Sequence, residues 1–308
     1  MDNRSDPAYI TVDGYIDVHT YGSLYFFIML LVYISVICSN SLIIYIIWKE
    51  PNLHKPMYFF IAALSFNSLL FSSTVYPKLL IDLLSDKQVI LYMACLFQWF
   101  SYYNLVGSEF LLLASMAYDR YVSICKPLQY LNIMRNSKIC VFVGFAWVFP
   151  VCHTIIPLSF NYNKKLCHFN FRGIICNSTV YRLFCVASPA LSIFGMIIFT
   201  NVVIFPFLFI FYTYSRIFYI VKRSKEMRKK AFETCLPHLV VLINFAVFST
   251  YDIILLRIET EFPKPVRFFV TLQMIIYHPL LNPLIYGLKM KEIYKHIKKF
   301  LCSLIVSY

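Results

Sequence analysis

The sequence Met116-Ala-Tyr-Asp-Arg-Tyr-Val-Ser-Ile-Cys125 ends a long apolar segment that begins near Tyr92. Asp119 and Arg120 stand side by side at the end of this segment, which is long enough to cross a membrane. Ionisable side chains at membrane depth are costly, and they usually mark functional positions. The stretch therefore predicts a membrane-spanning helix that ends in a charged functional site.

The composition extends this prediction to the whole chain. Of the 308 residues, 60% are hydrophobic and 14% are charged, whereas soluble domains carry about 25% charged residues. A hydrocarbon core of about 30 Å requires about 20 apolar residues in a helix. Seven segments are long enough: residues 23–48, 57–84, 92–124, 139–160, 189–221, 231–257 and 268–288.

Each segment must satisfy its own backbone hydrogen bonds in lipid, so we expect helices. The predicted fold class is an all-α membrane protein, with a seven-transmembrane helix bundle and a short amphipathic C-terminal helix. The predicted regions are an extracellular N-terminal tail at residues 1–22, the bundle at residues 23–288, and a cytoplasmic amphipathic helix and tail at residues 289–308.

Basic residues gather on one side of the predicted bundle. The loops at residues 49–55, 126–138 and 222–230, the tail after residue 288, and Arg120 and Arg216 hold 18 of the 28 Lys and Arg residues. By the positive-inside rule this side is cytoplasmic. The predicted location is the plasma membrane, with the N-terminus outside the cell and the C-terminus in the cytoplasm. The basic loop at residues 222–230 fits anionic membrane lipid, so we expect no nucleic-acid partner.

Four further motifs follow in order along the chain. They are Leu-His-Lys-Pro-Met-Tyr-Phe-Phe at residues 53–60, Thr-Tyr at 213–214, Lys-Ala-Phe-Glu-Thr-Cys-Leu-Pro-His-Leu at 230–239, and Pro-Leu-Leu-Asn-Pro-Leu-Ile-Tyr at 279–286. With the stretch at 116–125, they resemble the odorant receptor branch of the rhodopsin-like (class A) G-protein-coupled receptors. The resemblance implies a small-molecule odorant as ligand, a heterotrimeric G protein of the cAMP-raising type as partner, and no enzymatic activity.

The resemblance also assigns roles in activation. In the family, Arg120 would contact the G protein after the sixth helix swings outward, and Asp119 would restrain Arg120 at rest. The full set of residues implied in G-protein coupling and activation is Asp119, Arg120, Tyr214, Asn282, Pro283 and Tyr286. Pro283 is also expected to make a deformable point, because proline removes a backbone donor from the helix.

Counting along the helices from the matched motifs predicts the ligand pocket. The predicted ligand-binding residues are Tyr102, Tyr103, Val106, Phe199, Val202, Thr250, Ile253 and Arg257. Most are apolar or aromatic, which suits a small ligand held by a few polar groups. Arg257 would bind a carboxylate through two hydrogen bonds; the alternative is a surface ion pair with Glu259 or Glu261.

Glu109 lies deep within the third predicted helix, roughly 16 Å from Arg120 along the helix axis. A carboxylate at this depth predicts an ion or proton site. Ser68 stands where the second helix of these receptors often carries aspartate. Bound sodium and a protonated, hydrogen-bonded carboxyl group therefore both remain open for Glu109.

Cys95, Cys167, Cys176 and Cys185 lie on the predicted extracellular side, where disulfides persist. Their spacing leaves three pairings open. The resemblance implies the pair Cys95–Cys176, which leaves Cys167–Cys185. Asn3 begins the glycosylation sequon Asn-Arg-Ser. No Cys or His spacing predicts a metal site, and no cofactor is expected.

Two alternatives also fit parts of the sequence. A non-olfactory class A receptor for a small ligand or peptide fits the same motifs. Its amine and opsin forms are disfavoured, because Tyr102 and Ile276 stand where those receptors carry aspartate and the retinal lysine. A membrane transporter is a remote alternative, since the sequence shows no inverted repeat and few ionisable residues within the spans.

Overall fold

The computed structural model describes residues 9–13, 18–162, 164–186, 188–222, 224–257 and 264–306. The long helices are α1 (Val18–Lys49), α2 (Pro56–Leu84), α3 (Tyr92–Cys125), α5 (Asn136–Tyr162), α6 (Pro189–Phe199), α7 (Phe205–Val221), α8 (Lys225–Arg257), α9 (Lys264–Lys289) and α10 (Lys291–Val306). The short elements are η1 (Pro51–Leu53), η2 (Pro127–Gln129), α4 (Tyr130–Ile133), η3 (Ser178–Leu183), the π-helix η4 (Thr200–Ile204), and the strands β1 (Tyr9–Val12), β2 (Val89–Leu91) and β3 (Asn170–Phe171).

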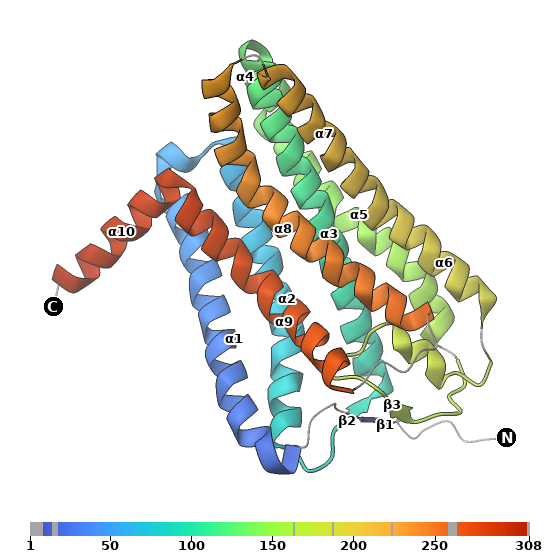
Figure 1. Cartoon of the computed structure of the whole chain (residues 1–308). Coiled ribbons are helices and arrows are strands. Elements are labelled where there is room, and N and C mark those ends of the chain that lie inside the picture. Colours follow the sequence, from blue (N-terminus) through green and yellow to red (C-terminus); the bar gives the residue numbers. More distant parts are fainter. Residues whose placement is uncertain are drawn as a thin grey trace.

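Within the described chain, the long helices before α10 form one bundle (Figure 1), with α6, η4 and α7 continuous as a single span. The spans coincide with the seven apolar segments predicted from the sequence, and the fold class is confirmed. Four spans are apolar over a full membrane-length window: Tyr21–Lys49, Pro56–Leu84, Asn136–Tyr162 and Pro189–Val221. Helices α3 and α8 carry more polar residues, among them Glu109, Asp119 and Arg120 of α3 and His238 of α8.

Helix α10 leaves the bundle at the end where α4 also lies (Figure 1). Ile293 is fully buried, Ile297 is partly buried against the bundle, and Lys291, Lys295 and Lys298 are exposed. One apolar face opposite a basic face is the pattern of a helix that lies at a membrane surface. The amphipathic C-terminal helix predicted from the sequence is therefore present.

The opposite end of the bundle carries a small sheet with strand order β2-β1-β3. Strand β1 pairs antiparallel with β2 and parallel with β3. Its sequence Tyr-Ile-Thr-Val alternates in exposure, and Ile10 is fully buried, as expected for a strand with one face on a core. The N-terminal tail predicted from the sequence thus supplies the central strand of a cover over this end.

Both predicted disulfides are formed. Cys95–Cys176 ties the first turn of α3 to the loop before η3, and Cys167–Cys185 closes a smaller ring within the same loop. The pairing implied by the family resemblance is therefore the one in the structure. Together with the sheet, these links hold the long loop between α5 and α6 over the bundle.

Two prolines in α9 leave backbone carbonyl groups without a hydrogen-bond donor in their own helix, and side chains of other helices donate to them instead. Proline lacks the N–H that would bond to the carbonyl four residues earlier. The carbonyl of Ile275, freed by Pro279, accepts from the Tyr76 hydroxyl at 3.2 Å. The carbonyl of Pro279, freed by Pro283, accepts from Asn40 Nδ2 at 2.9 Å. Helix α9 bends by 42° between Phe268–Tyr277 and Pro279–Leu288. The bend adjoins Pro279, four residues before Pro283, where the deformable point was predicted, and the contacts from Tyr76 and Asn40 hold this part of α9 to α2 and α1.

Candidate ligand-binding and coupling sites

Asp119 and Arg120 form an ion pair at the end of α3. Arg120 Nη2 lies 2.7 Å from Asp119 Oδ2, and Arg120 Nε donates to the same oxygen at 3.2 Å. The Asp119 side chain is fully buried, whereas 17% of the Arg120 side chain is exposed. The carboxylate thus holds the guanidinium at the edge of the bundle, where a partner can still reach it.

Tyr130 of α4 completes this site and was not predicted from the sequence. Its hydroxyl donates to Asp119 Oδ1 at 2.8 Å. Burial and then the Asp119 charge raise the pKa of Tyr130 above its usual value, so the phenol keeps its proton and remains a donor. Each carboxylate oxygen of Asp119 therefore has a partner, and the loop that follows α3 is fastened to the pair.

Tyr214 and His238 join α7 to α8 on the same side of the bundle. The Tyr214 hydroxyl is hydrogen-bonded to His238 Nδ1, and both side chains are buried. His238 lies in the motif at residues 230–239, but no role for its side chain was predicted from the sequence. Tyr286 of α9 is also buried, and its hydroxyl has no hydrogen-bond partner among the described residues. Tyr286 is one of the coupling residues predicted from the sequence, and its hydroxyl is still available to donate a hydrogen bond.

Glu109 lies at the centre of a buried polar cluster. Its Oε2 accepts from Asn67 Nδ2 at 3.0 Å, and its Oε1 accepts from Asn282 Nδ2 at 2.6 Å. Asn282 also donates weakly to Ser68 Oγ at 3.4 Å, and Asn67 Oδ1 accepts from Trp147 Nε1 at 3.3 Å. One carboxyl group therefore links α3 to α2 and α9, and Asn67 extends the link to α5.

A small cavity adjoins this cluster. Its volume is about 20 Å³, which is enough for one water molecule. Its lining residues are Glu109, Val241, Asn244, Phe245, Met274, Tyr277, Leu281 and Asn282. The cavity connects the polar cluster to the interior faces of α8 and α9.

The predicted ligand pocket lies nearer the end that the sheet covers. Tyr102 and Val106 are buried, and Phe199 and Thr250 are partly buried. The Tyr103 hydroxyl donates to Ser178 Oγ at 2.7 Å and accepts from the Ser178 N–H at 3.0 Å. Tyr103 therefore supports the loop that covers the bundle, in addition to any contact with a ligand.

Val202 belongs to η4 and points toward α3. A Cβ atom on Gly107 would lie 2.7 Å from Val202 Cγ1 and 3.0 Å from Pro150. Only a glycine permits this close approach of three helices, so Val202 packs between helices at this point. The side chains of Ile253 and Arg257, and the whole of Asn3, lie outside the described residues.

Comparisons with known proteins agree with the motifs. The sequence profile of the family described as olfactory receptor matches residues 29–304. Olfactory receptor 6K3 of Homo sapiens is 32% identical over 319 aligned positions, which cover 97% of this chain and 91% of that receptor. Olfactory receptor 4K3 of Homo sapiens is 34% identical, covering 89% and 87%, and olfactory receptor 5G29 of Mus musculus is 34% identical, covering 89% and 88%. The chain therefore belongs to the olfactory receptor family, whose members are multi-pass receptors of the plasma membrane that signal through G proteins and are not enzymes.

Proposed function

We propose that this receptor binds a small odorant in the half of the bundle beneath the sheet and activates a G protein of the stimulatory, cAMP-raising type. The observation that supports coupling most directly is the ion pair of Asp119 with Arg120, in which only the guanidinium is partly exposed. A ligand shifts a receptor between states only if it binds one of them better. Release of Arg120 from Asp119 is the proposed change at the G-protein side.

The contact between Tyr214 and His238 supports a route from ligand to coupling site. It holds α8 against α7, and Arg120 is close enough for its charge to act on both side chains. Outward movement of α8 would separate His238 from Tyr214 and uncover Arg120. Tyr214 would then be free to support the released guanidinium, together with Tyr286.

His238→Leu should raise ligand-independent signalling, because it removes the hydrogen bond to Tyr214 that stabilises the resting arrangement. A typical buried hydrogen bond contributes about 1 kcal/mol, which corresponds to roughly a fivefold change in an equilibrium between two states. Basal cAMP, normalised to the receptor at the cell surface, is the measurement. Thr213→Val alters the neighbouring buried hydroxyl, whose hydrogen bond in the described part of the chain stays within its own helix, and should leave basal cAMP unchanged. Basal signalling of His238→Leu at or below the wild-type level would argue against this role.

Glu109 is proposed as the ion or proton site of the receptor. Both of its carboxyl oxygens accept from amide N–H groups, which hold the group between α2 and α9 at the centre of the bundle. The adjoining cavity has room for a water molecule, which would give a proton a path to exchange. We therefore propose that Glu109 takes up either a sodium ion or a proton when the receptor changes state.

The proposed orientation places the N-terminus outside the cell and the C-terminus in the cytoplasm. It is supported by the net charge of +13, all of it on the side that carries α4 and α10, where membrane lipid and the G protein would be met. An epitope tag at the N-terminus should be stained in intact cells, and a tag at the C-terminus only after permeabilisation. Staining of the C-terminal tag in intact cells would overturn the orientation.

The proposed function as a whole is tested by a ligand screen. Cells that express the receptor would be exposed to amino acids, bile acids, amines and small volatile compounds, and cAMP would be recorded. At least one compound should raise cAMP in a saturable manner, and cells that express Arg120→Ala should not respond to it. A compound that signals equally through both receptors would refute coupling through Arg120.

A further inference from the structure

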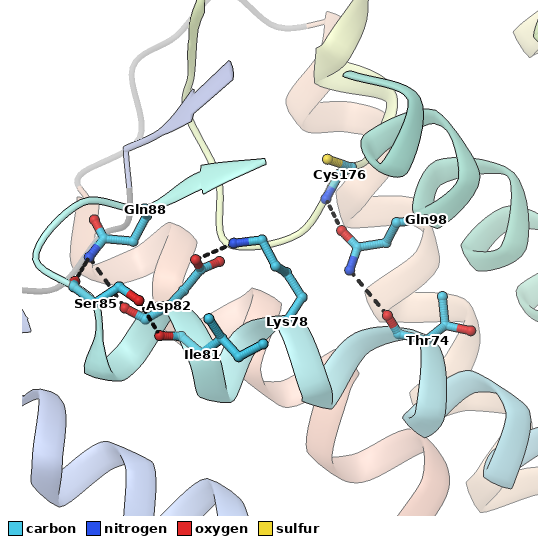
Figure 2. Close-up of polar contacts among 8 residues, drawn as sticks. All are labelled: Thr74, Lys78, Ile81, Asp82, Ser85, Gln88, Gln98 and Cys176. Atoms are coloured by element: carbon cyan, nitrogen blue, oxygen red, sulfur yellow. Dashed lines mark hydrogen bonds and ion pairs between the residues drawn. The ribbon is translucent and has the colours of Figure 1, made fainter. Parts of the chain in front are cut away.

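Lys78 and Asp82 form an ion pair in the last turns of α2, close to the end that the sheet covers. The Lys78 ammonium is hydrogen-bonded to Asp82 Oδ1, and the exposed fractions of the two side chains are 24% and 11%. Figure 2 shows both side chains on one side of α2, near the turn in which the helix ends. The pair is thus largely shielded from solvent, and neither residue belongs to a motif that led to the family.

The pair faces the bundle and not the lipid. Asp82 shares the buried face of α2 with Leu79 and Val75, which precede it by about one and two helical turns, respectively. One turn below Lys78, Gln98 of α3 ties this part of α2 to the covering loop. Gln98 Nε2 donates to the Thr74 carbonyl at 3.2 Å, and Gln98 Oε1 accepts from the Cys176 N–H at 2.9 Å (Figure 2). The charges therefore lie at the mouth of the bundle.

The other contacts in Figure 2 cap the helix without using the Asp82 carboxylate. Gln88 Nε2 donates to the carbonyl of Ser85 at 2.7 Å and to the carbonyl of Asp82 at 3.3 Å, and Ser85 Oγ donates to the Ile81 carbonyl at 2.7 Å. Among the described residues, Lys78 is the single side-chain partner of the carboxylate. Two of the three ammonium protons of Lys78 have no partner among those residues either.

Stability of the fold does not explain this pair. An acidic residue near the C-terminus of a helix faces the negative end of the helix dipole. A lysine four residues before the acid is the weaker order for such a pair. The loss of hydration offsets most of the attraction between buried charges. Ionisable groups kept at such a position in a membrane protein usually serve a function.

We propose that Lys78 and Asp82 bind the two charged groups of a zwitterionic ligand of the α-amino-acid type. Lys78 would bind the α-carboxylate and Asp82 the α-ammonium. Lys78 and Asp82 together carry no net charge, and a zwitterion adds none. In the complex, each positive group would therefore lie beside negative groups. A simple carboxylic acid would place a negative charge beside Asp82, and a simple amine would place a positive charge beside Lys78; both are disfavoured where water is scarce.

The surroundings also indicate the kind of amino acid. Below the pair, the same face of α2 presents Val75 and Phe71, and the Phe71 ring packs on Tyr102 of α3 with centroids 5.7 Å apart. Tyr102 belongs to the ligand pocket predicted from the sequence. An apolar or aromatic side chain extending from the charged pair would meet these groups. This inference rests on the proposed odorant-binding function and names the ligand class for it.

The first test changes the ligand and requires no variant. Binding of L-phenylalanine, L-leucine and L-methionine to the purified receptor in lipid nanodiscs would be measured, alongside their methyl esters and N-acetyl derivatives. The ester removes the negative charge, and acetylation removes the positive charge. At least one amino acid should bind, and each of its two derivatives should bind at least about tenfold more weakly. Absence of binding by all three amino acids, or equal binding of the derivatives, would overturn the proposal.

The second test changes the pair. Lys78→Met and Asp82→Asn should each weaken binding of the amino acid at least about tenfold, whereas the exchanged pair Lys78→Asp/Asp82→Lys should retain most of it. Lys87→Met is the matched control, because Lys87 is an exposed lysine beyond the end of α2. Unchanged binding by folded Lys78→Met would overturn the proposal. If that variant does not fold, the comparison of amino acids with their derivatives still tests the proposal.

The outcomes separate this inference from the proposed function. A receptor that signals through Arg120 in response to other odorants, but binds none of the three amino acids, would overturn the zwitterion site alone. A receptor that binds an amino acid through Lys78 and Asp82 without any rise in cAMP would support the site and count against the proposed coupling.

Discussion

Arg120→Ala should leave the receptor at the cell surface and reduce the ligand-driven cAMP response at least about tenfold, equivalent to roughly 1.4 kcal/mol or more. The guanidinium is the partly exposed member of an ion pair whose carboxylate is fully buried. A charge held in this way is available to a partner as soon as the pair separates. Alanine removes the group that we expect to contact the G protein, and it leaves the spans and disulfides in place.

Arg216→Ala provides the matched control for this prediction. Arg216 lies near the end of α7, is exposed, and packs against the Tyr219 ring at 6.0 Å. Its removal lowers the positive charge on the same side of the bundle by the same amount. Normal surface expression with a normal response in Arg120→Ala would show that Arg120 serves only as a charge that fixes the orientation. Equal losses in both variants would point to a general effect of charge.

The spans were predictable because one physical requirement dominates them. A membrane-crossing helix needs a sufficient apolar length, and this length can be read directly from the sequence, as in residues 189–221, which match α6, η4 and α7. Strand β1 was not predictable in the same way. Four alternating residues are a weak signal, and the partners of β1, in β2 and β3, lie far away in the sequence. Only the folded bundle brings these three segments together.

The site was predicted where its residues are consecutive and missed where they come from different helices. Asp119 and Arg120 are neighbours in the sequence, and their pairing is seen. Tyr130 and His238 lie in segments that were noted, but their partners depend on how the loop and α8 pack. Asn67 was missed for the same reason, since an asparagine within an apolar helix does not reveal which acid it will meet.

The pocket illustrates a further limit of counting along a helix. The predicted inward direction of Tyr102 and Val106 is matched by their burial. Val202 is buried too, but it lies in the π-helix η4 and packs against Gly107. Counting gives the direction of a side chain and not what it meets. Contact of these residues with an odorant accordingly remains a prediction.

Glu109→Ala should be the most destabilising change at the centre of the bundle. The carboxyl group accepts from Asn67 on α2 and Asn282 on α9, and all three side chains are buried. Removing it leaves two buried amide groups without these acceptors, and each unsatisfied group costs about 1–3 kcal/mol. Several kcal/mol should lower the melting temperature of the purified receptor by at least about 5 °C. Surface expression should fall as well.

Glu109→Gln distinguishes the hydrogen bonds from the charge. The amide oxygen can still accept from Asn67 or Asn282, but its NH₂ group must then face the other amide, where it finds a donor. We expect an intermediate loss of stability at neutral pH. The exchangeable proton also disappears in this variant. If Glu109 exchanges a proton during activation, the basal activity of Glu109→Gln should no longer vary with pH in the way that wild-type activity does. Wild-type stability in both variants would exclude a structural role for the carboxyl group, and an unchanged pH dependence in Glu109→Gln would exclude the proton site.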